Sequence, residues 1–293
     1  MTSPVRHRRQ TRPALQTLML AGLAASLSLS GCTLTRDILY SPGREPPEAI
    51  NWVHGPPQSV TIVTPDKLSL AGYYWPGRTG DPDIYVYFHG RNGTAEGAAN
   101  VAQHLAGSGN AVLVASYRGF GRNHGGPTEE GLLRDAAAFI AKARELAGPG
   151  ARIWLVGHSI GSAVALHAAA ADGHIAGVIA MSAFVRVTDA APRFWRAFIP
   201  DRWENLTALR ELRVPILFVQ GGLDRFIPAG SGDVLFSNYD GAASLVMGET
   251  SRHNPDMRLL GPWIDQAIIA MQDGSLADLP SPPAGWIEKV RRP

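Results

Sequence analysis

Ser159 lies between two glycines in the stretch GHSIG, residues 157–161, which fits the pattern G-x-S-x-G. Because the chain has 32 glycines, this pattern alone arises by chance in roughly one such chain in five. The surroundings are more specific. Residues 153–156 are apolar and partly β-branched, as in a buried parallel strand, and the alanine-rich residues 163–171 favour a helix. A strand, a sharp turn and a helix in this order predict a nucleophile elbow, in which the serine hydroxyl projects above the sheet.

A serine hydroxyl is a poor nucleophile at neutral pH, so catalysis requires a base and an acid that orients the base. Of the nine histidines, His253 lies in the polar loop GETSRHNPDM just after the last apolar run, and we predict it as the base. Because nucleophile elbows of this kind use the chain order Ser, Asp or Glu, His, the acid should lie between Ser159 and His253. Asp224 fits, since it follows the apolar run in PILFVQGGLDRFIP. Asp189 is the alternative acid, although its neighbours resemble a helix start, where Asp is common as a cap.

The developing oxyanion also needs hydrogen-bond donors. The amide of Ile160 is one candidate, because it lies at the start of the helix after the elbow, where unpaired N–H groups favour negative charge. The stretch YFHGRNGT follows an earlier apolar run and resembles a His-Gly oxyanion loop. We therefore predict the amide of Arg91 as the second donor, with His89 and Gly90 shaping the loop.

The apolar runs that must position these residues alternate with helical patterns. The predicted strands span residues 84–88, 111–116, 153–156, 175–181, 215–220 and 244–247, and the predicted helices span 94–106, 128–146, 162–171 and 256–271. This alternation predicts an α/β fold with a mostly parallel sheet and helices on both faces. Two alternating runs before it, 59–64 and 68–75, predict an antiparallel hairpin. We find no internal repeat.

One interval breaks the alternation: residues 185–213, between the strands predicted at 175–181 and 215–220. With the hairpin counted, these are the sixth and seventh predicted strands. It contains the aromatic residues Phe194, Trp195, Phe198 and Trp203. Two interpretations stay open: a connecting helix whose rings fill the core, or a short cap over Ser159 whose rings form an acyl pocket.

The first 31 residues have the features of an export signal: an arginine-rich start, an apolar stretch from about residue 18 to 29, and small residues at its end. The sequence Leu29-Ser30-Gly31-Cys32 resembles the lipobox of bacterial lipoproteins, which implies a lipid on Cys32, the single cysteine. The alternative is a small core residue. We predict a signal peptide (1–31), a linker (32–57), a domain (58–272, with a cap at about 185–213), a C-terminal tail (273–293) and a membrane-anchored lipoprotein of the cell envelope.

The composition is that of a globular protein, with 45% hydrophobic and 18% charged residues, and excludes a disordered or fibrous chain. The formal charge of +2 depends on four arginines in the predicted signal peptide: Arg6, Arg8, Arg9 and Arg12. Without these four, 23 Lys and Arg stand against 25 Asp and Glu. We find no basic stripe and expect no nucleic-acid partner.

With serine, acid, base and oxyanion loop in order, residues 60–271 resemble an α/β-hydrolase. More narrowly, YFHGRNGT, SYRGFGRNHGGPTEEGLLRDA, GHSIGSAVA and GGLDRFIP resemble the bem46 group, related to the ABHD13 and ABHD17 type of serine hydrolases. Arg91, where relatives typically have Asn, and Ser162, where they usually have Gly, depart from the group's pattern. The resemblance implies hydrolysis of an acyl ester or thioester substrate without a cofactor. We also expect no metal site and a monomer.

These observations favour a membrane-anchored serine hydrolase in which Ser159 attacks an acyl carbonyl, His253 transfers the proton and Asp224 orients the imidazole. An acyltransferase or peptidase on the same fold is the first alternative, because the elbow serves any acyl-enzyme chemistry. A non-catalytic binding protein of the cell envelope is the second.

Arg118 could bind a substrate carboxylate or phosphate, or it could anchor its loop through an acid such as Asp135. The glycines around Arg118 favour the anchoring role.

Overall fold

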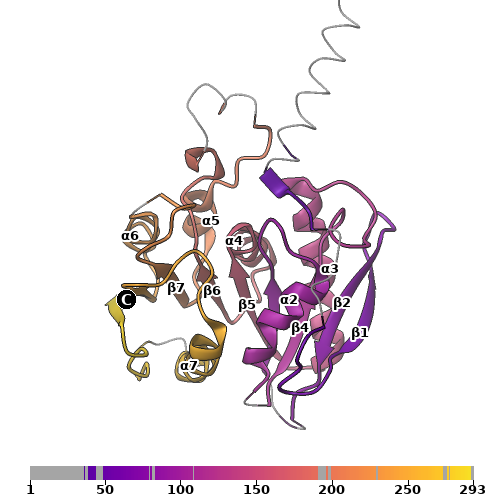
Figure 1. The fold of residues 1–293 in the computed structure, drawn as a ribbon, viewed down its shortest axis with the longest axis horizontal. Helices are drawn as coiled ribbons and strands as arrows, with labels where there is room; N and C mark the ends of the chain where they lie inside the picture. The colour runs from indigo at the N-terminus through magenta and orange to yellow at the C-terminus, as the bar shows by residue number, and fades with distance from the viewer. Residues whose placement is uncertain are drawn as a thin grey trace, which may run out of the picture.

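A nine-stranded sheet forms the centre of the protein in a computed structural model (Figure 1), with the strand order β1-β2-β4-β3-β5-β6-β7-β8-β9. The structure describes residues 36, 39–43, 49–78, 80, 83–107, 109–190, 196, 199–228, 230–272, 276 and 278–291. The predicted signal peptide and Cys32 therefore lie outside the described residues. Among the residues described, no helix is long and apolar enough to cross a membrane.

The six inner strands run parallel to one another and flank the elbow on both sides. They are β3 (Asp83–Phe88), β4 (Ala111–Ala115), β5 (Arg152–His158), β6 (Gly177–Met181), β7 (Ile216–Gly221) and β8 (Ala243–Gly248). Antiparallel strands close both ends: the hairpin β1 (Gln58–Val63) and β2 (Ser69–Trp75) on one side and β9 (Trp286–Arg291) on the other. The predicted hairpin and parallel strands are confirmed.

Helices cover both faces of the sheet, as predicted. One face carries α3 (Glu129–Ala147), α4 (Ile160–Asp172), α5 (Asn205–Glu211) and α6 (Ser231–Ser237), and the other carries α2 (Ala95–Ala102) and α7 (Met257–Ala270) (Figure 1). Among the elements that the structure describes are also the 3-10 turns η1 (Gln103–Leu105) and η2 (Val187–Ala190). Threonine hydroxyls cap two of the helices, because Thr94 accepts from the amide of Gly97 and Thr128 from the amide of Gly131.

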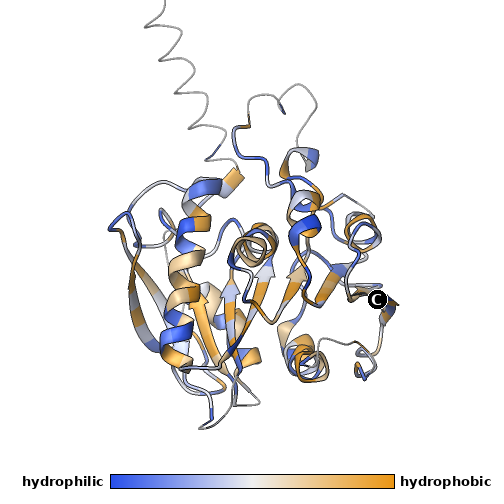
Figure 2. Cartoon of the chain, turned by 180° about the vertical axis from the view of Figure 1, so that it is seen from behind, coloured by the Kyte–Doolittle hydropathy of each residue, from blue (hydrophilic) through white to orange (hydrophobic). Residues whose placement is uncertain are grey.

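The central strands are buried on both faces, which explains why they read as continuous apolar runs. All six residues of β3 are buried: Val86 and Phe88 pack on the α3 and α4 side, and Tyr85 and Tyr87 pack on the α2 and α7 side. Figure 2 shows both hydrophilic and hydrophobic residues along α3, as expected for a helix with one face in solvent. The alanines of α4 allow this helix to pack closely between α3 and α5.

Two parts of the predicted domain organisation are wrong. Trp286–Arg291, predicted within a surface tail, pairs with β8 as strand β9, so the sheet continues beyond residue 272. Tyr40, predicted within the linker, is fully buried, and its hydroxyl donates to Asp201 at 2.8 Å. Arg36 forms an ion pair with the same carboxylate at 3.2 Å. Backbone pairing and a contact across 161 residues, rather than local sequence pattern, order these two segments.

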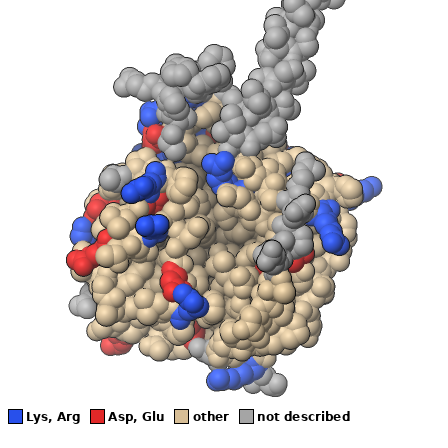
Figure 3. Space-filling model, in the orientation of Figure 1, with Lys and Arg blue, Asp and Glu red and all other residues tan. Residues whose placement is uncertain are grey.

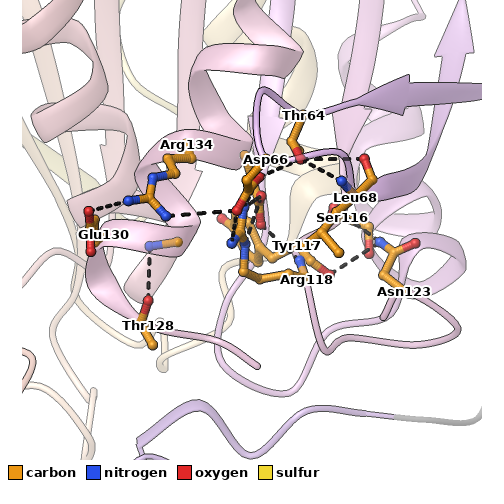
Figure 4. Close-up of polar contacts among 12 residues, drawn as sticks. Thr64, Asp66, Leu68, Ser116, Tyr117, Arg118, Asn123, Thr128, Glu130 and Arg134 are labelled. Atoms are coloured by element: carbon orange, nitrogen blue, oxygen red, sulfur yellow. Dashed lines mark hydrogen bonds and ion pairs between the residues drawn. The ribbon is translucent and has the colours of Figure 1, made fainter. Parts of the chain in front are cut away.

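Arg118 anchors its own loop, which agrees with the structural interpretation of its role. Its guanidinium donates to Asp135 at 2.7 and 2.9 Å. It also donates to Asp66 at 2.7 and 3.1 Å (Figure 4). Its backbone amide donates to Asp135 as well, at 2.9 Å. Burial raises the pKa of the Asp135 carboxyl, whereas the Arg118 hydrogen bonds lower the pKa of Asp66. Because Arg118 is engaged on two sides, it ties the start of the loop to α3 and to the β1–β2 hairpin.

Candidate active site

Ser159 stands at the junction of β5 and α4 in the strained geometry of an elbow. Its φ of 55° and ψ of −118° are unusual for a residue with a side chain. The flanking glycines are required by space, since a Cβ on Gly157 would lie 2.2 Å from the Gly161 carbonyl oxygen. A Cβ on Gly161 would lie 2.1 Å from the carbonyl oxygen of Phe88. The glycines thus allow the close packing of strand and helix that forces the serine side chain out of the turn.

The structure brings Ser159, His253 and Asp224 together. The Ser159 hydroxyl lies 3.0 Å from Nε2 of His253, and Nδ1 of the same ring lies 2.8 Å from Oδ2 of Asp224. Because an ionised carboxylate only accepts, Nδ1 carries the proton and Nε2 is left to accept from the serine hydroxyl. The side chains of His253 and Asp224 are 15% and 2% exposed, so the arrangement is shielded from most of the solvent.

Asp224 is held on its other oxygen by the turn that follows it. Oδ1 accepts from the amides of Phe226 at 2.8 Å and Ile227 at 3.1 Å. Burial opposes the charge of Asp224, but the hydrogen bonds from His253 and these two amides prevail and lower its pKa. The acid is therefore ionised at neutral pH and fixed in orientation.

The loops that carry the acid and the base are pressed together at Gly221 and Gly222. A Cβ on Gly221 would lie 2.4 Å from the Arg252 carbonyl oxygen, and one on Gly222 would lie 2.9 Å from that of Glu249. The amide of Leu223 donates to the Ser251 carbonyl at 2.9 Å across the same contact. Two glycines before the acid thus let the His253 loop approach the end of β7.

The predicted oxyanion loop lies against the serine. A Cβ on Gly90 would be 3.4 Å from Cβ of Ser159, and Ile160 is the first residue of α4. His89 shapes this loop from below, because its Nδ1 donates to the Gly90 carbonyl at 2.7 Å. Burial lowers the pKa of His89 to about 4, so its ring is neutral at physiological pH. Arg91 follows Gly90 in the chain, and the assignment of its amide as the second donor stays a prediction.

The predicted pocket residues Phe194, Trp195 and Phe198 lie outside the described residues. Trp203 is fully buried: its indole N–H donates to the Tyr40 hydroxyl at 3.2 Å, and its ring centroid is 5.6 Å from that of His167. Trp203 is therefore a core residue, which corrects its assignment to an acyl pocket.

The alternative acid and a missed aromatic residue complete the surroundings. Asp189, in η2, pairs at 3.1 Å with Arg186 just before this turn, and the contact with His253 is made by Asp224 instead. Phe226, which the sequence analysis did not single out, lies beside His253 with a centroid distance of 5.1 Å and is 68% exposed. Its place two residues after Asp224 was the available signal. An exposed ring next to the base offers an apolar surface to a bound molecule.

Three exposed arginines adjoin the residues of the site in sequence. Arg91 follows Gly90, Arg225 follows Asp224, and Arg252 precedes His253. None of the three makes a side-chain hydrogen bond or ion pair within the described part of the chain. Figure 3 shows one face of the molecule that is largely uncharged around a central hollow, with Lys and Arg as well as Asp and Glu in separate groups about it. Among the described residues, no group of three His, Cys, Asp or Glu side chains could hold a metal ion.

Comparison with known proteins gives matches over most of this architecture. A family model described as serine aminopeptidase S33, Hydrolase_4, matches residues 82–208. An uncharacterized protein of Mycobacterium tuberculosis is 31% identical over 206 residues, which are 66% of this chain and 71% of that protein. Protein bem46 of Schizosaccharomyces pombe is 26% identical over 193 residues, 61% of this chain and 64% of its own length.

Two solved structures show the likeness in three dimensions. An alpha-beta hydrolase from Vibrio vulnificus superimposes with a TM-score of 0.67 at 20% identity, over 92% of this chain and 98% of that one. The esterase Pf2001 of Pyrococcus furiosus superimposes with a TM-score of 0.60 at 17% identity, over 80% of this chain and 97% of that one. At these identities the structural likeness concerns the fold.

Proposed function

The chain belongs to the α/β-hydrolase family, and from that premise we propose that it is a serine hydrolase that cleaves carboxylic ester or thioester bonds. One observation carries the proposal: the Ser159 hydroxyl, the His253 imidazole and the Asp224 carboxylate form one hydrogen-bonded chain with contacts of 3.0 and 2.8 Å. A hydroxyl, an imidazole base and a fixed carboxylate in this order are the requirements for acyl transfer to serine.

In the proposed reaction, Ser159 Oγ forms a bond to the acyl carbon while Nε2 of His253 takes the hydroxyl proton. The negative charge on the substrate oxygen is stabilised by the amides of Ile160 and Arg91. His253 then gives its proton to the departing alcohol or thiol, and the acyl-serine ester remains. A water molecule, deprotonated by the same nitrogen, repeats the attack, releases the acid and restores the Ser159 hydroxyl. Asp224 stabilises the imidazolium in both halves.

The charges next to the site favour an ester or thioester over the substrate of an aminopeptidase. An aminopeptidase must hold the ammonium group of its substrate, for which carboxylates are the natural partners. The charged residues that adjoin the site residues in the sequence are instead the exposed arginines Arg91, Arg225 and Arg252, and we propose that they repel an ammonium and attract an anionic substrate.

Labelling with a fluorophosphonate probe and hydrolysis of p-nitrophenyl esters test the reaction. The unaltered chain should be labelled and should cleave the esters, whereas Ser159→Ala should lose the label and at least about 1,000-fold in kcat. Ser231→Ala is a matched control, because Ser231 is a buried serine that donates only to the Pro228 carbonyl. Equal ester hydrolysis by Ser159→Ala would refute the assignment, and a folded chain that takes no probe would favour a binding protein.

The alternatives of peptidase and acyltransferase are separated by the products. Faster cleavage of amino-acid p-nitroanilides than of esters would favour the peptidase, and acyl transfer to added alcohols or amines in preference to water would favour the transferase. Replacing Arg225 and Arg252 by Gln should raise KM several-fold for esters that carry a carboxylate and leave KM for neutral esters unchanged.

We also propose that Cys32 carries the lipid that anchors the protein to a membrane of the cell envelope. The support is the export signal and the Leu29-Ser30-Gly31-Cys32 sequence. Metabolic labelling with an alkyne fatty acid should mark the protein, and Cys32→Ser should abolish both the label and its partition into detergent. Label retained by Cys32→Ser would refute the anchor.

A further inference from the structure

The backbone carbonyl of His253 accepts two side-chain hydrogen bonds from the sheet. Nε2 of His158 lies 2.8 Å from this oxygen, and the hydroxyl of Ser182 lies 2.7 Å from it. His158 is the last residue of β5, and Ser182 follows the last residue of the neighbouring strand β6, Met181, which pairs with His158. The two donors therefore come from the parallel sheet, while the acceptor belongs to the loop after β8.

The donor state of His158 is fixed by its surroundings. A carbonyl oxygen only accepts, so Nε2 must carry the ring proton. Burial lowers the pKa of His158 to about 4, which keeps the ring neutral with a single N–H at neutral pH. Its other nitrogen faces the oxyanion loop, because a Cβ on Gly90 would lie 3.2 Å from Nδ1. The ring is thus wedged between the oxyanion loop and the base.

Ser182 is held just as firmly. It is 1% exposed and its amide donates to the Val219 carbonyl of β7 at 2.8 Å. Its φ of 49° lies in the left-handed region, which a residue other than glycine adopts only when its surroundings impose it. In this conformation the backbone no longer follows β6, and the Ser182 hydroxyl donates to the carbonyl of His253.

Ser159 is held by the same two strands, β5 and β6, that carry the donors His158 and Ser182. The amide of Ser159 donates to the carbonyl of Met181 at 2.9 Å, and Ser159 follows His158 in the chain. Any displacement of the His253 carbonyl relative to His158 and Ser182 is therefore also a displacement of the imidazole relative to the serine hydroxyl.

We propose that His158 and Ser182 are positioning residues: their two hydrogen bonds clamp the carbonyl of His253 and hold the imidazole in line with Ser159. The proposal rests on the proposed function, since it concerns the alignment of the same base. It assigns a role to the first variable residue of the G-x-S-x-G pattern and to a serine that lies 23 residues beyond the elbow. In this role the two side chains contribute to the alignment of the imidazole and not to substrate binding.

Steady-state kinetics of the purified full chain test the clamp. Ser182→Ala and His158→Leu each remove one donor and should lower kcat for p-nitrophenyl butyrate about five-fold, and the double variant about 25-fold, with KM within about two-fold. His158→Gln places an amide N–H near the position of Nε2 and should recover kcat to within about two-fold of the unaltered chain. Ser231→Ala, which removes a buried hydroxyl from a different carbonyl, should keep full kcat. Unchanged kcat in the double variant, or a loss that His158→Gln does not repair, overturns the clamp.

A readout without substrate separates this proposal from the proposed function. The proton shared by His253 and Asp224 should give a downfield NMR resonance, assigned by its loss in His253→Gln, that broadens and exchanges faster with solvent in Ser182→Ala. If the unaltered chain cleaves no ester and the resonance still broadens, the clamp stands while the proposed function fails. An identical resonance in Ser182→Ala and in the unaltered chain refutes the clamp. Should His158→Leu not fold, Ser182→Ala alone decides.

Discussion

Replacing Gly221 by Ala should misalign the base from a position outside the Ser159, His253 and Asp224 side chains. An added Cβ would lie 2.4 Å from the Arg252 carbonyl oxygen, whereas ordinary Cβ contacts begin at 3.4 Å. The loop just before His253 must therefore retreat by about 1 Å, and a misplacement of about 1 Å in an active site costs on the order of 100-fold in rate. Gly221 has no positive φ, so Ala can adopt its backbone conformation, and only the contact is changed.

The assay is kcat on p-nitrophenyl butyrate together with thermal unfolding. Gly222→Ala, whose Cβ would lie 2.9 Å from the Glu249 carbonyl oxygen, requires about half that movement and should lose less activity. Gly126→Ala meets nothing within 4 Å and should behave as the unaltered chain. Overpacking should cost Gly221→Ala about 1–3 kcal/mol of stability without unfolding it. The reasoning is refuted if Gly221→Ala keeps kcat within two-fold, or if the three variants do not follow this order.

Three further outcomes follow from the charges of the site and the core. Because burial lowers the pKa of His89 and His158 to about 4 from the ordinary 6.5, the unfolded chain binds their protons first, so stability present above pH 6.5 should be lost as the pH falls toward 4. At about 1.4 kcal/mol per pKa unit the loss should reach a few kcal/mol, measured by urea unfolding between pH 7 and pH 4. Arg118→Met leaves Asp135 buried without its cation and should cost about 3–5 kcal/mol by the same measurement. Asp224→Asn removes the acceptor that fixes the imidazole tautomer and should lower kcat about 10,000-fold at nearly unchanged stability.

Each of these outcomes has a result that contradicts it. Stability that stays constant from pH 7 to pH 4 would mean that the buried imidazoles gain their protons as readily as in the unfolded chain. Arg258→Met removes an exposed ion pair and should cost less than about 1 kcal/mol; an equal loss in Arg118→Met would deny Arg118 its anchoring role. Asp224→Asn with more than a tenth of the original kcat would point to another orienting acid.

The elbow and the parallel strands could be predicted because their signals are local. A buried parallel strand reads as an apolar run, and the tight approach of β5 and α4 leaves glycines at 157 and 161. The acid and the base could be predicted from chain order alone, because each follows the carboxyl end of a strand. The structure then supplies what order cannot, the 3.0 and 2.8 Å contacts.

The remaining features depend on partners that are far apart in the sequence. The residues of β9 alternate only weakly, and the strand is ordered by backbone pairing with β8. Tyr40 is buried through Asp201, which comes 161 residues later. The His158 ring and the Ser182 hydroxyl donate to a backbone carbonyl, and the direction of a carbonyl cannot be predicted from the type of its residue. The aromatic pattern predicts a pocket position for Trp203, but its ring packs against His167, which lies 36 residues earlier in the chain.

If Cys32 carries the proposed lipid, the burial of Tyr40 limits the distance between the protein and the membrane. Tyr40 is the eighth residue after Cys32, and eight fully extended residues span at most about 29 Å. Under the proposed lipidation, the segment between Cys32 and Tyr40 is shorter than the thickness of a bilayer with its headgroups, about 40–45 Å. The surface of the protein near Tyr40 and Asp201 would then lie close to the lipid headgroups. The protein would encounter substrates near the membrane surface by lateral diffusion in two dimensions.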